Sequence, residues 1–238
     1  MRRPTLAIIL LMFPGASPGV VLAQQLRGDE RIVATSEAFL GAHPDLRYRL
    51  SGLDAHGRGD YPRALADFQR AAHYGDKPSQ SMLGEMHWQG TGTPVDRGLA
   101  YVWMDLAAER GYTLMLAKRE HYWRSLDEAE RTRALALGAD MYDDYGDDVA
   151  KPRLARELKR ARRDITGSRV GSIGNLDILI PTSSGTRRIS GQDYYDPRFW
   201  EPEQYFRWQD SQWLPPAQGR VEVGEITSGD DPPSRSED

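Results

Sequence analysis

Small side chains recur at a fixed interval in the middle of the chain. Segments 64–75 and 100–111 carry alanine or glycine at four matching positions, 36 residues apart: Ala64 and Ala100, Ala71 and Ala107, Ala72 and Ala108, Gly75 and Gly111. In each segment a bulky residue, Phe68 or Met104, lies one helical turn after the first alanine. This spacing is typical of amphipathic helices that pack closely through small residues. The glycines are suited to end these helices, because glycine readily takes left-handed backbone angles.

A second helix precedes each of these segments, which predicts two antiparallel helix pairs. Residues 50–57 lead through a short turn to Pro62, which suits the first turn of a helix. Residues 79–88 lead through a longer glycine-rich loop to Asp96, a candidate N-cap. We therefore expect stacked helix pairs.

The run from Leu83 to Gly111, LGEMHWQGTGTPVDRGLAYVWMDLAAERG, resembles a Sel-one-like repeat, a relative of the tetratricopeptide repeat. The residues that fit the family pattern are Leu83, Gly84, Gly90, Gly92, Asp96, Ala100, Trp103, Ala107, Ala108 and Gly111. His87 and Thr93 depart from it, since the family usually has Tyr and Val there. Residues 48–75 resemble an ordinary tetratricopeptide unit and 113–145 a degenerate third one, so the resemblance covers about 45–148. It implies a mainly α fold, a short right-handed α-α solenoid.

The resemblance also implies a binding surface, because the first helix of each pair lines the concave side of such arrays. The tetratricopeptide register assigns these positions to that side: Arg49, Leu53 and His56, then Ser81, Glu85, Trp88 and Gln89, and by the 36-residue interval His121 and Arg124. We expect five of them to contact a protein or peptide partner: Arg49, His56, Glu85, Trp88 and Arg124. The alternative is that two or three repeats form an array too short for a groove.

A strongly basic segment follows the repeats. Residues 151–164 carry seven lysines and arginines, with Leu154 and Leu158 one helical turn apart. We expect this segment to form the last helix of the array. Its leucines would then pack against the array, and its cations would face water or the preceding aspartates. Contact with an anionic lipid or an acidic polymer is the alternative.

From residue 166 onward the pattern changes. A period of two in 175–180 and 220–224 predicts short strands that lean on the helices. Residues 194–213 hold eight of the 22 aromatic residues of the chain. Either these rings are buried, with Phe199, Trp200, Phe206 and Trp213 as main contributors, or they stack on sugars. The candidates for such stacking, in a protein associated with peptidoglycan, are Tyr195, Trp200 and Trp208.

The first 23 residues resemble a secretory signal peptide. Arg2 and Arg3 precede an apolar stretch over 5–13, and Val21 and Ala23 suit cleavage after Ala23. A membrane anchor is the alternative, but the stretch is shorter than the roughly 20 residues that span a bilayer. We expect a periplasmic or secreted protein that is not an integral membrane protein after cleavage. The predicted organisation is a signal peptide, an N-terminal segment, a helical repeat domain, a β-containing aromatic-rich cap and a disordered tail: 1–23, 24–44, 45–165, 166–226 and 227–238.

The composition of the chain argues against several classes of function. With 31 Lys and Arg against 35 Asp and Glu, the net charge of −4 disfavours a nucleic-acid binder. The chain has no cysteine, so it has no thiolate metal site and no cysteine nucleophile. Its five histidines are scattered and form no catalytic motif. We expect no catalytic residues, no cofactor and no metal site, hence a non-catalytic adaptor of the bacterial cell envelope. A glycan-associated envelope module is the alternative.

Overall fold

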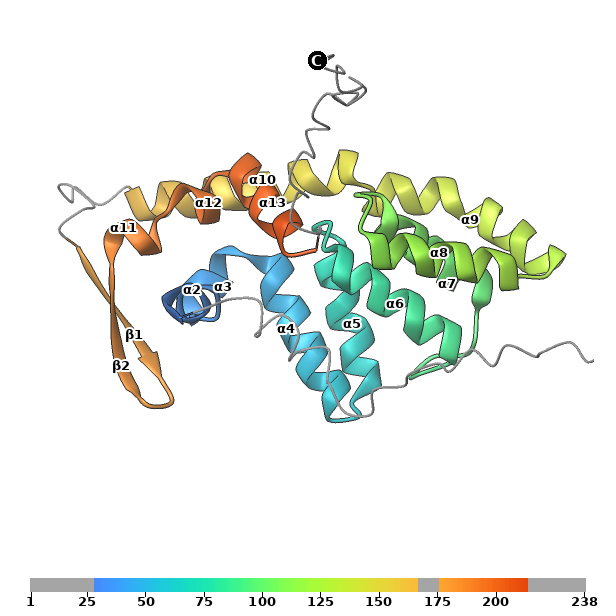
Figure 1. Ribbon diagram of the computed structural model, residues 1–238, viewed down its shortest axis with the longest axis horizontal. Coiled ribbons are helices and arrows are strands. Elements are labelled where there is room, and N and C mark those ends of the chain that lie inside the picture. Colours follow the sequence, from blue (N-terminus) through green and yellow to red (C-terminus); the bar gives the residue numbers. More distant parts are fainter. Residues whose placement is uncertain (1–27, 167–175, 214–238) are drawn as a thin grey trace, which may run out of the picture.

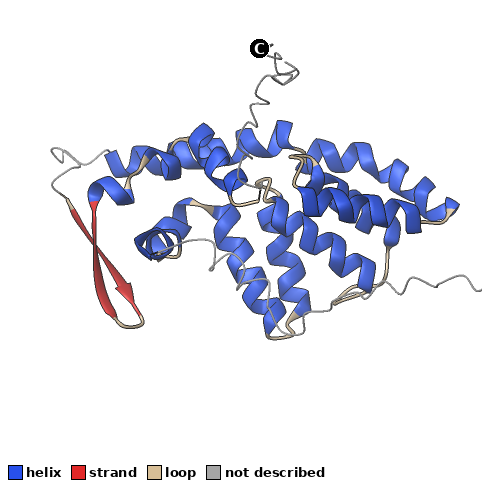
Figure 2. Cartoon of the chain, in the orientation of Figure 1, coloured by secondary structure: helices blue, strands red, loops and turns tan. Residues whose placement is uncertain are grey.

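The computed structural model describes residues 28–166 and 176–213, and most of their regular structure is helical (Figure 2). Two antiparallel helix pairs are stacked at the centre (Figure 1): α4 (Pro44–Gly57) with α5 (Tyr61–Ala72), and α6 (Lys77–Gln89) with α7 (Arg97–Ala108). Two short helices precede them, α2 (Gly28–Ala34) and α3 (Glu37–Ala42). The predicted fold class, mainly α with stacked helix pairs, is confirmed.

The two pairs are built alike, as the repeated small residues predict. Asp60 and Asp96 cap α5 and α7, each accepting a hydrogen bond from the backbone N–H three residues on. Gly75 and Gly111 follow the ends of these helices with φ of +75° and +76°. A Cβ on Gly52 of α4 would lie only 2.7 Å from the Phe68 ring, so the lack of a side chain there lets α5 approach.

A third unit follows, but it is not a third pair of the same kind. It consists of α8 (Thr113–Ser125) and α9 (Glu128–Tyr145), which both pack mainly against α7. Asp127 and Glu130 form a reciprocal capping box at the start of α9. The unit is therefore helical as expected and degenerate in its packing.

The helix α10 (Asp147–Thr166) leaves the stack and runs beside the C-terminal helices (Figure 1). These helices are α11 (Gly191–Tyr194), α12 (Pro197–Trp200) and α13 (Pro202–Ser211). Leu154 and Leu158 are buried among their aromatic rings, together with residues of α2, α3 and α4. The docking of the two leucines is confirmed, but α10 covers the N-terminal end of the array and does not extend it.

The two ends of the described chain meet in this aromatic core. The ring of His43, just before α4, is buried and lies with Nε2 2.7 Å from the carbonyl oxygen of Phe199. The hydroxyl of Tyr205 on α13 donates to Asp45 on α4, at 2.6 Å. Helices α12 and α13 are thus fixed to the start of the first repeat.

The C-terminal strands form a single hairpin, in part as predicted. Strands β1 (Asp177–Thr182) and β2 (Gly185–Ser190) pair antiparallel, with Ile178 opposite Ile189. β1 was expected, but β2 was not, since the two arginines of β2 are exposed and interrupt the apolar alternation. The predicted strand 220–224, the tail 227–238 and the signal peptide 1–23 lie outside the described residues.

Candidate protein-binding groove

A groove of about 190 Å³ lies along the first helices of the three units, α4, α6 and α8. Its apolar lining consists of Leu53, Pro78, Met82, Leu114 and Met115, and its polar lining of Arg49, Ser81, Glu85 and Lys118. Trp213, which follows α13, also contributes to it. Four positions assigned by the tetratricopeptide register, Arg49, Leu53, Ser81 and Glu85, therefore share one surface.

Arg49 forms part of the groove floor, but its side chain is only 2% exposed. Nη2 donates to Oε1 of Gln209 at 3.1 Å, and Nε lies 3.4 Å from a carboxylate oxygen of Asp76. Arg49 was predicted to contact a partner, but its charge is already paired inside the protein, with Asp76. Its role in the structure is to fix α4 to α6 and α13.

A buried carboxyl group lies next to this arginine. Asp45 accepts hydrogen bonds through one oxygen from Tyr205 and from Gln209, at 2.6 and 3.1 Å. Burial and the negative charge of Asp76 raise the pKa of Asp45 to about 6, although Tyr205 and Arg49 oppose the shift. Asp45, Arg49 and Gln209 thus form a buried polar cluster beneath the groove. The apolar side chains of the lining lie between this cluster and the solvent.

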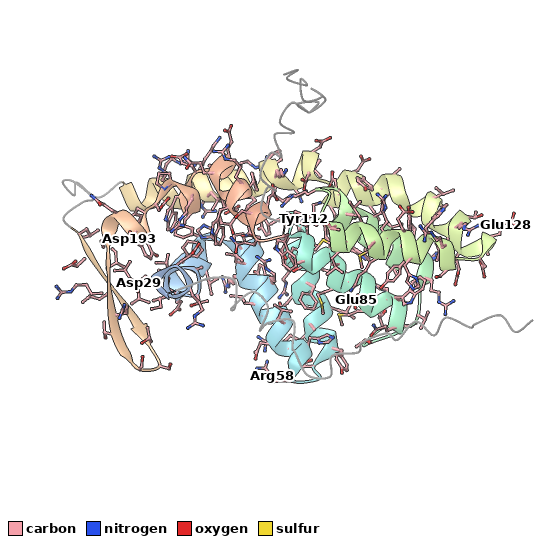
Figure 3. All side chains as sticks on the ribbon, viewed as in Figure 1. Asp29, Arg58, Glu85, Tyr112, Glu128 and Asp193 are labelled. Carbon is pink, nitrogen blue, oxygen red and sulfur yellow. The ribbon has the colours of Figure 1, made fainter. Side chains whose placement is uncertain are left out.

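Glu85 projects from α6 (Figure 3) and forms an ion pair with Lys118 of α8. Both side chains are partly exposed and line the groove. The pair places one negative and one positive group beside apolar surface. Surface ion pairs of this kind contribute little to stability, so both groups can exchange partners when a ligand binds.

Three of the expected contact residues do not line the groove. The half-buried ring of Trp88 is stacked on Tyr122 at 4.0 Å, and the Arg97 guanidinium lies 5.2 Å from its centre. Its contacts join α6 to α8. His56 packs edge-on against Tyr61 near the end of α4, and Arg124 is exposed near the end of α8.

Half of the groove residues that the prediction missed come from α8, and the others are Pro78 and Met82 of α6 and Trp213. Leu114 is 61% exposed, an unusual position for a large apolar side chain, and Lys118 lies one helical turn further on. They come 36 residues after Pro78 and Met82, which also line the groove but were likewise not assigned to the concave side by the register. Trp213 could not have been found from the sequence, because no local pattern connects it with helices 100 residues earlier.

Comparison with known proteins identifies the repeats. The family model of the Sel1 repeat matches residues 44–77 and 77–112, that is, the pairs α4–α5 and α6–α7. The chain contains two Sel1 repeats. Both central units are thus Sel1 repeats, including the first, which the sequence pattern likened to an ordinary tetratricopeptide unit. Sel1 repeats are commonly protein-interaction modules.

One similar solved structure is a protective antigen present in uropathogenic Escherichia coli strains, described as displaying an SLR fold. It is 20% identical to this chain, with a TM-score of 0.42. The match covers 65% of this chain and 32% of the antigen, so this chain spans about a third of its length. The search of curated proteins gives no match.

The aromatic rings next to the Sel1 repeats are largely part of the core. Trp200 is 3% exposed and donates through Nε1 to the carbonyl oxygen of Tyr194, and Trp208 is 9% exposed and donates to Glu30. Tyr195 is half-buried against Trp200, with ring centres 5.8 Å apart. The glycan-stacking alternative is therefore wrong for Trp200 and Trp208, because neither presents a ring face to a sugar. The expected burial is confirmed for Phe199 and Trp200, whereas Phe206 and Trp213 are half-buried.

Residues 28–166 and 176–213 contain neither a metal-binding cluster nor a membrane-spanning helix. No group of three or more His, Asp or Glu side chains in them could hold a metal ion. No helix in this part of the chain is long and apolar enough to cross a membrane.

Proposed function

We propose that this protein is a non-catalytic adaptor that binds a protein segment or peptide in the groove along α4, α6 and α8. The exposed apolar surface of the groove carries the proposal. Leu114 is 61% exposed next to Leu53, Met82 and Met115 in one concave lining. Contiguous apolar surface in a hollow is a common sign of a binding site, and stacked helix pairs commonly use their concave side in this way.

The lining also indicates the chemistry of the partner. Its apolar side chains come from three helices, so an extended segment or a short helix with several apolar side chains can contact all three. Glu85 and Lys118 favour a partner that also carries one charge of each sign near its apolar residues. We therefore infer an apolar peptide segment of low net charge as the ligand.

We expect the substitution Leu114→Glu to weaken peptide binding at least tenfold, because it places a charge on the apolar lining. Peptides are first selected from a displayed random library on the full chain, and their affinities are then measured by fluorescence anisotropy. Leu135→Glu is the matched control, since Leu135 is 71% exposed but lies on α9, outside the groove. Equal losses in the two variants, or no selected peptide that depends on Leu114, would contradict the proposal.

We further propose that the adaptor works in the bacterial periplasm or after secretion. The support is the sequence of residues 1–23, with its two arginines, apolar stretch and small residues before Gln24. N-terminal sequencing of the protein purified from its native cells is expected to start at Gln24. A protein that retains Met1, or one recovered only with membranes, would speak against export by a cleaved signal peptide.

A further inference from the structure

The groove already contains one residue from the C-terminal part of the chain. Trp213 follows α13 and lines the groove next to residues of α4, α6 and α8. Its ring is stacked at 6.3 Å on Tyr112, which precedes α8, and it packs against the apolar cluster around Met115. Trp213, the residue from which the chain continues to Leu214, is therefore itself part of the groove lining.

Three buried donor nitrogens of the groove residues have no hydrogen-bond partner in the part of the chain that the structure describes. They are Nε1 of Trp213 and both Nε and Nη1 of Arg49, of which Nε lies 3.4 Å from the carboxylate of Asp76. Both residues line the groove, and the Arg49 side chain is almost fully buried. A buried donor without an acceptor is unfavourable, so this surface calls for a ligand that carries acceptor oxygens. The backbone carbonyls of an extended peptide supply them.

The segment after Trp213 has the chemistry that such a surface takes. Residues 214–226 read LPPAQGRVEVGEI, and Pro215 and Pro216 favour an extended backbone with free carbonyl oxygens. In an extended segment, successive side chains point to opposite sides. When Val221 and Val223 face the apolar lining of the groove, Arg220 and Glu222 therefore face its rim. Glu85 and Lys118 offer the opposite charges there.

The segment is also long enough. Three packed helices at about 8–10 Å spacing are crossed by about 20 Å of chain. Val221 comes eight positions after Trp213, and extended chain covers about 3.3 Å per residue. The valines can therefore reach either the near or the far side of the groove.

We propose that residues 214–226 bind in the groove of their own chain and compete with the external partner. This inference rests on the proposed function, because it assigns a second occupant to the same groove. A short tether gives an effective concentration on the order of millimolar. An intrinsic dissociation constant of about 0.1 mM then suffices to occupy the groove in roughly nine molecules of ten. The adaptor is thus self-blocked until a partner displaces the segment.

The first experiment uses the full chain with a fluorescent synthetic peptide of residues 214–226 as the probe. In one variant the apolar side chains of the tethered segment are removed by Leu214→Ser, Val221→Ser and Val223→Ser. In the control, Pro232→Ser and Pro233→Ser lie beyond the segment. We expect the first variant to bind the probe at least tenfold more tightly than the natural chain, and the control to bind it like the natural chain. Adding Leu114→Glu to the first variant should remove the gain, whereas adding Leu135→Glu should not.

The second experiment locates the tethered segment directly. The natural chain has no cysteine, so Leu114→Cys with Val221→Cys creates one possible intramolecular disulfide. We expect this pair to oxidise at least tenfold faster than Leu135→Cys with Val221→Cys, in dilute protein under the same mild oxidant.

The outcomes separate the two proposals. Equal oxidation rates, or equal probe affinity in the natural chain and the serine variant, overturn the self-blocking inference. If library-selected peptides still bind in a manner that depends on Leu114, the adaptor proposal stands without it. If neither the selected peptides nor the probe binds, both proposals fail.

Discussion

Replacing Phe68 with alanine is expected to lower the free energy of unfolding by about 3–5 kcal/mol. The ring is fully buried between α4, α5 and the second repeat, and it lies against Gly52, where no side chain competes for the space. Alanine would leave a cavity, because the backbones of α4 and α5 are already in close approach. Urea denaturation followed by helical circular dichroism measures the change.

Leu135→Ala serves as the control for this substitution, because Leu135 is 71% exposed on α9 and its loss should change stability by less than about 0.5 kcal/mol. A loss below about 1 kcal/mol for Phe68→Ala would show that the small residues and the ring do not nest as described. The test therefore addresses the repeat packing itself and is independent of the proposed function.

Asp147→Ala is expected to destabilise the protein by about 3–5 kcal/mol at neutral pH. The carboxylate accepts two hydrogen bonds from Arg110, at 2.8 and 2.9 Å, and lies 3.0 Å from the ammonium of Lys77. The side chain of Lys77 is fully buried and that of Arg110 is 9% exposed. Removing the carboxylate takes the main partner from Arg110 and one of two neighbouring carboxylates from Lys77, which keeps Glu109 at 2.6 Å. Asp143→Ala, at an exposed position of α9, should have little effect.

The loss of stability caused by Asp147→Ala should depend on pH. Burial would raise the pKa of Asp147, but its hydrogen bonds and charge interactions with Arg110, together with Lys77, hold the pKa well below its ordinary value. A carboxyl group with a lowered pKa stabilises the folded state above its unfolded pKa of about 4, and this contribution is lost as the pH falls further. The difference in unfolding free energy between the natural chain and Asp147→Ala should therefore be smaller at pH 3 than at pH 7. An equal difference at both pH values would contradict this role of the ionised carboxylate.

The repeats could be predicted from the sequence because their signals are local. Small residues such as Gly52 and Ala64, a capping aspartate and a final glycine all act within one helix pair. Their spacing in the sequence therefore predicts how the two helices of a pair pack. The prediction of a third unit was correct for its two helices but did not give their packing. Nothing in the sequence of residues 113–145 specifies that α8 and α9 both contact α7.

The site was only partly predictable, because distant residues decide which side chains are available. The tetratricopeptide register placed Arg49 on the concave side correctly, but Gln209 and Asp76 already bind its guanidinium. Gln209 is 160 residues away in the sequence, and no local sequence pattern predicts its contact with Arg49. Trp88 lies outside the groove for a related reason, since its ring is stacked on Tyr122, which comes from the degenerate unit.

The contact between Tyr205 and Asp45 has a consequence for biosynthesis. In most repeat arrays each unit is completed by its immediate neighbour, so the chain can fold progressively as it emerges. Here the start of the first repeat is covered by helices about 160 residues later. At the usual speed of translation those helices follow after roughly 10–30 seconds. During that time the aromatic and aliphatic side chains of α3 and α4 stay accessible to chaperones, and folding is completed only when the last helices have been made.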